Sequence, residues 1–474
     1  MKELNVEIAV LGSGPGGYTA AFRAADLLKK PGQVALIERY PDLGGVCLNI
    51  GCIPSKTLLH VSETIRSTEK LKTKGLSWDN PVIDLAQLRA HKKAVVGQLT
   101  SGLSALAKAR QVNVLQGTGI LNDPHSLIVT PRDGEPTKII FKKLILAVGS
   151  RPIKLPFLPT DSRIVDSTGA LNLPFIPKKM LVIGGGIIGM EMASIYSALG
   201  SKITIVELGS QLIPSADEDI VKPLVKFAQQ HYESILMQTK VKNVIAKKEG
   251  LLVSFEGVDA PKESVNYDMI LSAVGRRPNG DLIGLEKAGL RLNQRGFIEV
   301  DDQQRTVVEH IFAIGDCASD PMLAHKAIPE GKVAAEVACG LPSAFLGRLI
   351  SSVAYTDPEI AWVGQTERQL KKDNIPYEKS VFPWAANGRS LALGRQDGLT
   401  KLLFDPKTKH ILGAGIAGPH AGDLIAEITL AIEMGCVAED LALTIHPHPT
   451  LSETIAQSCE AFEGTITDLM PMHR

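Results

Sequence analysis

Two stretches of the chain repeat one pattern of apolar and polar positions. Residues 6–11 form an apolar run that predicts a buried strand, a glycine-rich turn follows, and the alanine-rich residues 15–28 predict a helix. Residues 178–200 repeat that order in the middle of the chain. In both stretches the next apolar run ends on an acid, Glu38 or Glu207. The pattern predicts a duplicated βαβ unit, with parallel strands that are covered by helices on both faces.

Changes of pattern divide the rest of the chain. Apolar runs that end in Ala-Val-Gly close the two units, and residues 310–319 (HIFAIGDCAS) predict a further strand that leads into a turn. From residue 351 the alternation is typical of antiparallel strands followed by helices. We therefore predict an α/β fold with two Rossmann-like domains and a C-terminal α+β domain. The predicted segments are 1–152, 153–279, 280–350 (a return to the first domain) and 351–474.

Composition and charge exclude several classes of partner. Hydrophobic residues make up 44% and charged residues 22% of the 474 residues, as in ordinary globular proteins. Lys plus Arg (51) equals Asp plus Glu (51), which argues against nucleic acid or an anionic membrane surface as a partner. Residues 1–14 contain no signal-like apolar segment, and the apolar stretch 180–199 is interrupted by glycines and Glu191. We expect a cytoplasmic protein without membrane insertion.

The first glycine-rich turn has the spacing of a dinucleotide-binding motif. Gly12, Gly14 and Gly17 form G-x-G-x-x-G directly after a predicted strand and at the start of a predicted helix. The first glycine allows a tight turn, the second lets a pyrophosphate approach the backbone, and the third packs the helix on the strand. Glu38 stands where an acid would accept the ribose hydroxyls. An ordinary turn is the alternative, but strand, helix and acid together favour the nucleotide.

The second turn repeats the motif with Gly184, Gly186 and Gly189, and Glu207 follows at the equivalent position. A carboxylate there accepts bonds from the ribose hydroxyls and repels a 2′-phosphate, so it favours NAD over NADP. No arginine adjoins Glu207 to reverse that preference. Two such units in one chain predict one permanently bound and one exchanging dinucleotide.

Cysteine spacing singles out one pair. Of the six cysteines (47, 52, 317, 339, 436 and 459), only Cys47 and Cys52 are close in sequence, and no Cys-x-x-Cys pair or histidine cluster predicts a metal site. Both lie in GGVCLNIGCIPSK (44–56), at what looks like the start of a helix. A helix N-terminus favours the thiolate, the nucleophile of disulfide exchange. Two buried, inert thiols are the alternative interpretation.

An ordered set of motifs resembles one enzyme family. GSGPGGY, GGVCLNIGCIPSK, GGGIIGMEMAS, AVGRRPN, HIFAIGD, PMLAHKA and HPHPTLSE follow one another over essentially the whole chain. Together they resemble the flavoprotein disulfide reductases, the class I pyridine nucleotide-disulfide oxidoreductases. The resemblance implies a redox-active disulfide between Cys47 and Cys52, FAD in the first domain, NAD in the second, and a homodimer formed by the C-terminal domain.

The resemblance also assigns roles to individual residues. Lys56 is expected near the flavin and paired with Glu191; a plain surface ion pair is the alternative. The FAD positions implied are Gly12, Gly14, Gly17, Glu38, Lys56, Gly119, Gly149, Asp316, Leu323 and Ala324. The NAD positions implied are Gly184, Gly186, Gly189, Glu207 and Gly275. Pro329 and Cys317 depart from the expected pattern, and we interpret Pro329 as a local helix start and Cys317 as a small buried residue.

The histidines near the C-terminus differ in their expected roles. His448 matches the family pattern H-P-T-L-x-E, which implies a general base toward a substrate thiol, oriented by Glu453. In this family that histidine serves the partner subunit. His446 does not match the pattern and is interpreted as a satisfied core or surface histidine.

Within the family, the chain is most similar to the members that oxidise dihydrolipoamide to lipoamide and reduce NAD+. The expected partners are lipoylated carrier domains of 2-oxoacid dehydrogenase acyltransferase cores or of a glycine-cleavage carrier protein. Glutathione reductase is disfavoured by Glu207, and mercuric reductase by the absence of a cysteine pair in the tail TDLMPMHR. A redox-inactive scaffold would be expected to lack at least one of Cys47, Cys52, His448 and Glu453.

Overall fold

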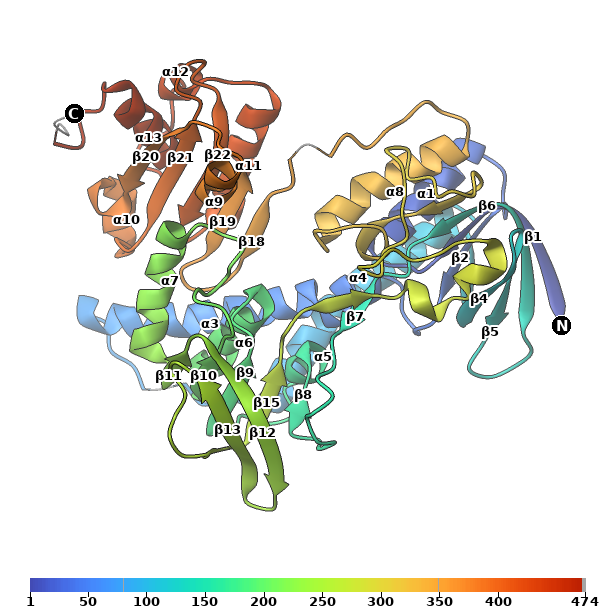
Figure 1. The fold of residues 1–474 in the computed structure, drawn as a ribbon, viewed down its shortest axis with the longest axis horizontal. Helices are drawn as coiled ribbons and strands as arrows, with labels where there is room; N and C mark the ends of the chain where they lie inside the picture. Colours follow the sequence, from blue (N-terminus) through green and yellow to red (C-terminus); the bar gives the residue numbers. More distant parts are fainter. Residues whose placement is uncertain (80, 348, 471–474) are drawn as a thin grey trace.

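The computed structural model describes residues 1–79, 81–347 and 349–470, and it has three parts (Figure 1). The N-terminal part and the yellow segment that returns to it lie at the right of the view. The green middle part lies below, and the orange to red C-terminal part lies at the upper left. The predicted α/β class, with two Rossmann-like units and a C-terminal α+β domain, is confirmed.

The N-terminal part is built on a seven-stranded sheet in the order β3-β2-β1-β6-β5-β4, with β17 added to β6. Strands β1, β2, β3, β6 and β17 pair in parallel, while β4 and β5 form an antiparallel extension. The strands are β1 (Lys2–Leu11), β2 (Val34–Glu38), β3 (Asn113–Gln116), β4 (Thr118–Asp123), β5 (Ser126–Thr130), β6 (Thr137–Leu146) and β17 (Ile311–Ala313). The helices are α1 (Pro15–Leu28), α2 (Gly45–Ile50), α3 (Cys52–Leu71), α4 (Leu85–Ala109) and α8 (Ala324–Ala338). The chain thus returns to the N-terminal part after β16, where Ile283 and Leu285 already pack in the core of the first sheet.

The middle part repeats the doubly wound arrangement on a parallel sheet in the order β11-β10-β9-β15-β8. Its elements are β8 (Ile164–Val165), α5 (Ser167–Leu171), β9 (Lys179–Ile183), α6 (Ile187–Ala198), β10 (Lys202–Val206), α7 (Glu218–His231), β11 (Ser234–Leu236) and β15 (Met269–Ser272). An antiparallel sheet of β12 (Thr239–Lys247), β13 (Gly250–Gly257) and β14 (Val265–Tyr267) is inserted before β15. The short strands β7 (Ser150–Pro152) and β16 (Arg276–Pro278) pair where the chain enters and leaves this part.

The C-terminal part contains an antiparallel sheet in the order β18-β19-β22-β21-β20, as the alternation from residue 351 predicts. The strands are β18 (Ser352–Ala354), β19 (Ile360–Gly364), β20 (Glu378–Pro383), β21 (Leu399–Phe404) and β22 (Ile411–Ala417). The helices are α9 (Glu367–Lys372), α10 (Gly388–Leu393), α11 (Ala421–Glu433), α12 (Ala438–Ala442) and α13 (Glu453–Glu463).

Helix α3 connects the three parts. It begins in the N-terminal part and runs between the middle and C-terminal parts (Figure 1). Leu58 and Leu59 belong to one buried apolar cluster with Tyr196 of the middle part and Trp362 of the C-terminal part. Burial of these side chains fixes the axis of α3. Side chains on neighbouring turns of α3 can therefore contact residues of the N-terminal, middle and C-terminal parts.

A buried charge cluster ties the middle part to the C-terminal part. The Lys401 side chain is only 1% exposed, and its Nζ donates to Asp217 at 2.9 Å, Asp219 at 2.7 Å and Glu367 at 2.5 Å. Burial lowers the pKa of Lys401, but the hydrogen bonds to the carboxylates outweigh it and raise that pKa. Burial likewise raises the pKa of Glu367, but donors led by Lys401 hold that pKa well below its usual range. These three carboxylates are close enough to ligate a cation, and the Lys401 ammonium already bonds to all of them.

Lys401→Met should destabilise the protein by about 3–5 kcal/mol, because it removes the buried cation that all three carboxylates share, and the partly exposed Lys379 reaches only Asp219 and Glu367. The free energy of unfolding from urea titration measures this change, and Lys371→Met, at an exposed lysine with one carboxylate partner at 3.5 Å, should change it by less than about 0.5 kcal/mol. The stabilisation that the ionised Glu367 carboxylate adds to the folded state should be complete above pH 4.5, the ordinary pKa of this group. It should decline as pH falls through the lowered pKa of the folded protein. Equal decreases in the free energy of unfolding for Lys401→Met and Lys371→Met would contradict a stabilising role for the Lys401 cluster.

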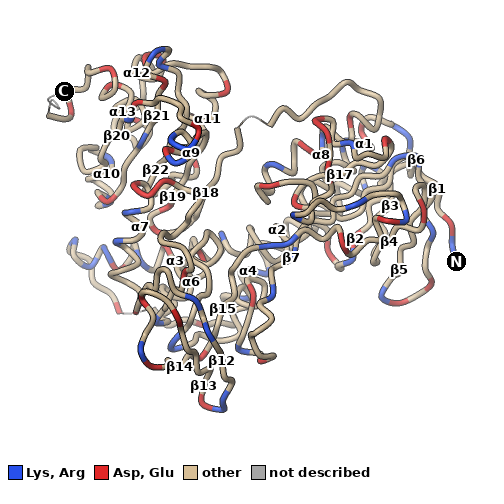
Figure 2. The backbone as a smooth tube through the Cα atoms, in the orientation of Figure 1, with Lys and Arg blue, Asp and Glu red and all other residues tan. Residues whose placement is uncertain are grey.

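Lys and Arg positions are interspersed with Asp and Glu positions along the backbone of all three parts (Figure 2). Within residues 1–79, 81–347 and 349–470, no helix combines the length and apolar character needed to cross a bilayer.

Candidate active site

The two glycine-rich turns have the same geometry. In the first turn, Glu38 accepts hydrogen bonds from the Ser13 N–H at 3.0 Å and the Ser13 hydroxyl at 2.6 Å. A Cβ on Gly12 would lie 2.3 Å from the carbonyl oxygen of Ala147, and one on Gly17 would lie 1.9 Å from that of Gly12. Both positions therefore require glycine, as the predicted turn and the helix-to-strand packing demand.

The second turn repeats these contacts in the middle part. Glu207 accepts from the Gly185 N–H and the Gly209 N–H, both at 2.7 Å. A Cβ on Gly184 would lie 2.5 Å from a carbonyl oxygen, and one on Gly189 would lie 2.0 Å from the carbonyl oxygen of Gly184. The duplication seen in the sequence is therefore a duplication of hydrogen bonds as well.

Open space at both turns fits a dinucleotide. Gly14 and Gly186 are the N-caps of α1 and α6; neither helix has a side-chain cap, and a Cβ on either glycine would meet nothing within 4 Å. A helix N-terminus with free N–H groups attracts a pyrophosphate. A cavity of about 320 Å³ lies beside the first turn, lined by residues that include Glu38, Tyr40, Leu43, Lys108, Val114 and Gln116.

A disulfide joins Cys47 and Cys52, whose Cα atoms are 4.7 Å apart. Cys47 lies in the short helix α2 and Cys52 is the first residue of α3, so the predicted single helix is in fact two. Gly51 separates them, and a Cβ there would lie 2.8 Å from the carbonyl oxygen of Val46. Opening the disulfide would leave the Cys52 sulfur at the N-terminus of a 20-residue helix, which favours the thiolate.

Lys56 follows one turn after Cys52 and pairs with Glu191 of α6, with Nζ 3.0 Å from both carboxylate oxygens. The predicted pairing is therefore present, and it bridges residues 135 apart in sequence. Tyr355 contacts both partners: its N–H donates to Glu191 at 3.1 Å, and its ring centroid lies 4.4 Å from the Lys56 Nζ. A cation–π contact of this kind restrains the ammonium.

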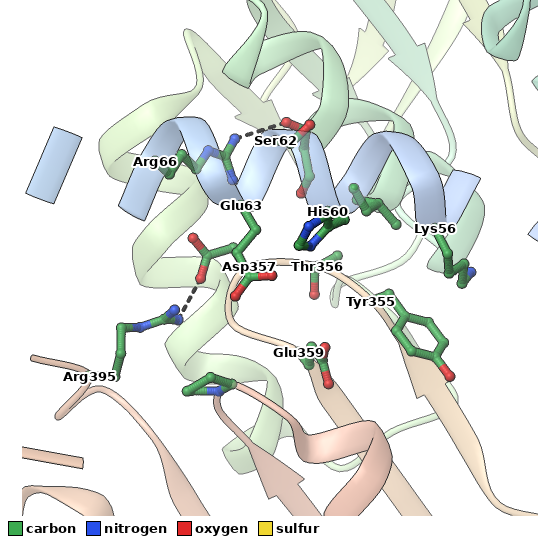
Figure 3. Close-up of a pocket in the computed structure, with 13 residues that line it drawn as sticks. Lys56, His60, Ser62, Glu63, Arg66, Tyr355, Thr356, Asp357, Glu359 and Arg395 are labelled. Carbon is green, nitrogen blue, oxygen red and sulfur yellow. Dashed lines mark hydrogen bonds and ion pairs between the residues drawn. The ribbon is translucent and has the colours of Figure 1, made fainter. Parts of the chain in front are cut away.

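A cavity of about 170 Å³ extends from Lys56 between α3 and the loop that follows β18 (Figure 3). His60 and Glu63 line it from the α3 side, and Tyr355 and Glu359 from the other. Burial, together with Glu359 and Glu191, raises the pKa of Tyr355, and burial raises the pKa of Glu359. The phenol is therefore neutral at physiological pH.

The C-terminal pair has the arrangement of an oriented base. Glu453 Oε1 lies 2.8 Å from His448 Nδ1, and Glu453 Oε2 accepts from the Thr450 N–H at 2.6 Å. The His448 side chain is 79% exposed. Within one chain, α13, which begins at Glu453, lies apart from α2, which contains Cys47 (Figure 2).

Comparison with known proteins assigns the chain to a family. The model of the pyridine nucleotide-disulphide oxidoreductases matches residues 6–331, and that of their dimerisation domain matches residues 350–459. The chain belongs to the pyridine nucleotide-disulphide oxidoreductases.

Relatives from this family match it along its whole length. The dihydrolipoyl dehydrogenases of Vibrio parahaemolyticus and Vibrio cholerae are each 52% identical over 469 residues, or 99% of this chain and 98% of theirs. That of Bacillus subtilis is 40% identical over 465 residues, or 98% of this chain and 97% of its own. Among solved structures, LpdA from Mycobacterium tuberculosis has a TM-score of 0.88 at 26% identity, with coverage of 96% of this chain and 99% of that one.

Family membership defines the class of chemistry. The protein is a flavoprotein oxidoreductase with FAD and NAD as cofactors, and it forms a homodimer through its dimerisation domain. Exposed apolar side chains in the dimerisation domain would suit such an interface: Leu430, Met434, Leu443 and Ile445 are all exposed, Ile445 at 96%.

The remaining predicted cofactor positions fall into two groups. Some border turns or helix starts: Gly149 and Gly275 have positive φ, Asp316 accepts from the Ser150 hydroxyl at 2.5 Å, and Leu323 and Ala324 begin α8. Gly119 instead lies in the sheet, where a Cβ would be 2.5 Å from a Leu11 methyl group. Its surroundings indicate packing rather than an open approach to a ligand, and its predicted role stays a prediction.

Sequence reasoning missed two residues of the site. Ser13 was identifiable from its place between two motif glycines, where its N–H and hydroxyl meet Glu38. Tyr355 carries no local signal, because its contacts to Lys56 and Glu191 arise only from the packing of distant segments.

Proposed function

We propose that this protein is a dihydrolipoyl dehydrogenase, which oxidises a dihydrolipoyl group to its disulfide and reduces NAD+. The observation that carries the proposal is the Cys47–Cys52 disulfide at the start of α3, one turn from a Lys56–Glu191 pair that connects the two dinucleotide units. The full-length relatives named dihydrolipoyl dehydrogenase support the choice of substrate.

The substrate half of the reaction is thiol–disulfide exchange. His448 of the partner subunit accepts a proton on Nε2 from one substrate thiol, because Nδ1 is engaged by Glu453. The thiolate attacks the Cys47 sulfur, the Cys47–Cys52 bond breaks, and Cys52 leaves as a thiolate at the α3 N-terminus. The second substrate thiol then attacks the substrate sulfur of the mixed disulfide, the bond to Cys47 breaks, and the proton of that thiol passes to the departing Cys47 sulfur. The lipoyl disulfide is released, with Cys47 as a thiol, Cys52 as a thiolate and the first proton on His448.

The first unit would hold FAD and the second NAD. Gly12, Gly14 and Gly17 would hold the FAD pyrophosphate on the α1 N-terminus, and Glu38 would accept its ribose hydroxyls. When bound, the flavin supplies two-electron transfer between the dithiol and the nicotinamide. The Lys56 ammonium, held by Glu191 and Tyr355, provides a fixed positive charge for that transfer.

Glu207→Ala should raise the KM for NAD+ about 10-fold to 100-fold, because the ribose loses a charged acceptor. The ratio of kcat/KM for NAD+ to that for NADP+ should fall, since the repulsion of a 2′-phosphate also disappears. Steady-state kinetics with both coenzymes measure this, and Glu207→Gln, which keeps an acceptor oxygen, should raise the KM less. An unchanged coenzyme ratio in Glu207→Ala would contradict the assignment.

The substrate would be presented on a protein. Lipoylated carrier domains of 2-oxoacid dehydrogenase acyltransferase cores, or of a glycine-cleavage carrier protein, are the proposed partners. A cytoplasmic location stays a prediction.

The test is NADH formation by the purified holoenzyme with NAD+ and free dihydrolipoamide, or with a reduced lipoylated carrier domain. The unlipoylated domain is the matched control. NADH should form with both lipoyl substrates and not with the control, and NADPH should not reduce glutathione disulfide. Reduction of glutathione disulfide without oxidation of dihydrolipoamide would make glutathione reductase the better assignment.

A further inference from the structure

We propose that His446 is a positioning residue that, through Glu427, holds the segment that carries His448. The inference rests on the proposed function for the role of His448. His446 contacts no substrate or cofactor in this scheme and acts only by fixing where His448 points.

The His446 ring is the side-chain anchor nearest to His448 on its N-terminal side. Of residues 443–449, His446 alone is not exposed, and its side chain is 7% exposed. The neighbouring apolar side chains, Leu443 and Ile445, point into solvent in the single chain. Packing of those side chains within the chain therefore does not hold the segment, and within one chain polar contacts do: the Thr444 hydroxyl donates to the Asp440 carbonyl oxygen at 2.7 Å, and the His446 ring contacts Glu427 at 2.7 Å.

Both ring nitrogens of His446 face acceptor oxygens. Nε2 lies 2.7 Å from Glu427 Oε1, and Nδ1 lies 2.9 Å from the Thr444 carbonyl oxygen. A carbonyl oxygen cannot donate, so the Nδ1 contact requires a proton on that nitrogen. The Nε2 contact then needs a second proton, placed on either the ring or the carboxyl group.

His448 differs from His446 in the use of its nitrogens. Glu453 engages its Nδ1, and the structure records no partner for Nε2 in residues 1–79, 81–347 and 349–470. The two histidines of the His-Pro-His-Pro run therefore have complementary arrangements. One has both nitrogens bound within the protein, and the other presents a nitrogen to solvent.

A second anchor follows His448. The Thr450 N–H donates to Glu453, and the Asn387 side chain donates to the Thr450 carbonyl oxygen at 3.1 Å. His448 is thus held between His446, fixed to α11, and Thr450, fixed to α13 and the loop before α10. Loss of the His446 contact leaves Thr444, four residues before His448, as the nearest side-chain anchor on that side. A displacement of about 1 Å can cost about 100-fold in a reaction that depends on orientation.

The consequence is confined to one half of the reaction. His448 takes part in proton transfer from the dithiol, whereas electron transfer from NADH through the flavin to an artificial acceptor such as ferricyanide bypasses it. His446→Leu should lower kcat for dihydrolipoamide oxidation at least 10-fold, with NADH–ferricyanide activity within twofold of wild type. Glu427→Gln, which can still make one neutral hydrogen bond to the ring, should lie between His446→Leu and wild type.

The experiment compares these variants as holoenzymes with His420→Asn, a control at an exposed histidine that precedes the same helix. Amide hydrogen exchange of residues 444–450 is measured alongside, because it reports the segment whatever the substrate. In His446→Leu this segment should exchange at least 10-fold faster, with α13 unchanged.

Selective loss of dithiol oxidation together with faster exchange supports the proposal. Unchanged exchange, or parallel loss of dithiol and ferricyanide activities, overturns it. If wild type reduces ferricyanide but does not oxidise dihydrolipoamide, the proposed function fails, and hydrogen exchange alone then decides whether His446 positions the segment.

Discussion

Cys52→Ser should reduce NADH formation from dihydrolipoamide and NAD+ to less than about a thousandth of the wild-type rate. Serine cannot form the bond that the structure shows between Cys47 and Cys52, so the protein can no longer accept an electron pair from a dithiol. Steady-state assays on the purified holoenzyme measure the loss. Electron transfer from NADH to ferricyanide should persist, because it does not use the disulfide.

Cys339→Ser is the matched control for Cys52→Ser. Cys339 is a free, half-buried cysteine at the C-terminal end of α8, outside the disulfide. Its substitution should leave dihydrolipoamide oxidation within twofold of wild type. Substantial dihydrolipoamide oxidation by Cys52→Ser would show that the electrons follow another route, and the assignment of the disulfide would be wrong.

His448→Gln should lower kcat for dihydrolipoamide oxidation by about 10²-fold to 10⁴-fold at neutral pH, because glutamine cannot accept the thiol proton. The remaining rate should rise about 10-fold per pH unit up to about pH 8.5, the ordinary pKa of a thiol, as the substrate ionises unaided. A pH–rate profile measures both effects.

His91→Gln, at an exposed histidine on α4, serves as the control for His448→Gln and should behave as wild type. A small decrease that is the same at every pH would contradict a role for His448 in deprotonation. Mixed dimers provide a further test. In the proposed function His448 serves the partner subunit, so a dimer of one Cys52→Ser chain and one His448→Gln chain should retain a single working site.

Local chemistry made part of the site predictable from sequence. The motif glycines and Glu38 or Glu207 lie within one βαβ unit, where spacing alone fixes their relation, and the turns have the predicted geometry. The Lys56–Glu191 pair joins distant positions and was predicted from the family resemblance rather than from spacing.

Contacts between distant segments could not be predicted. Tyr355, the His446–Glu427 pair and the Lys401 cluster each depend on how separate elements pack, which leaves no periodicity in the sequence. The interpretation of Pro329 as a helix start was wrong, since it lies inside α8. The helical turn before Pro329 packs closely on α1, where a Cβ on Gly16 would lie 2.9 Å from the Ala327 carbonyl oxygen. This packing outweighs the tendency of proline to interrupt a helix.

An anaerobic titration tests whether electrons pass from a dithiol through Cys47 and Cys52 to bound FAD and then to NAD+. Dihydrolipoamide is added to the yellow holoenzyme while its spectrum is recorded, and NAD+ follows. We expect a long-wavelength absorbance after the dithiol that is absent in Cys52→Ser, and then one NADH per dithiol oxidised. A flavin spectrum that the dithiol leaves unchanged would contradict this electron route.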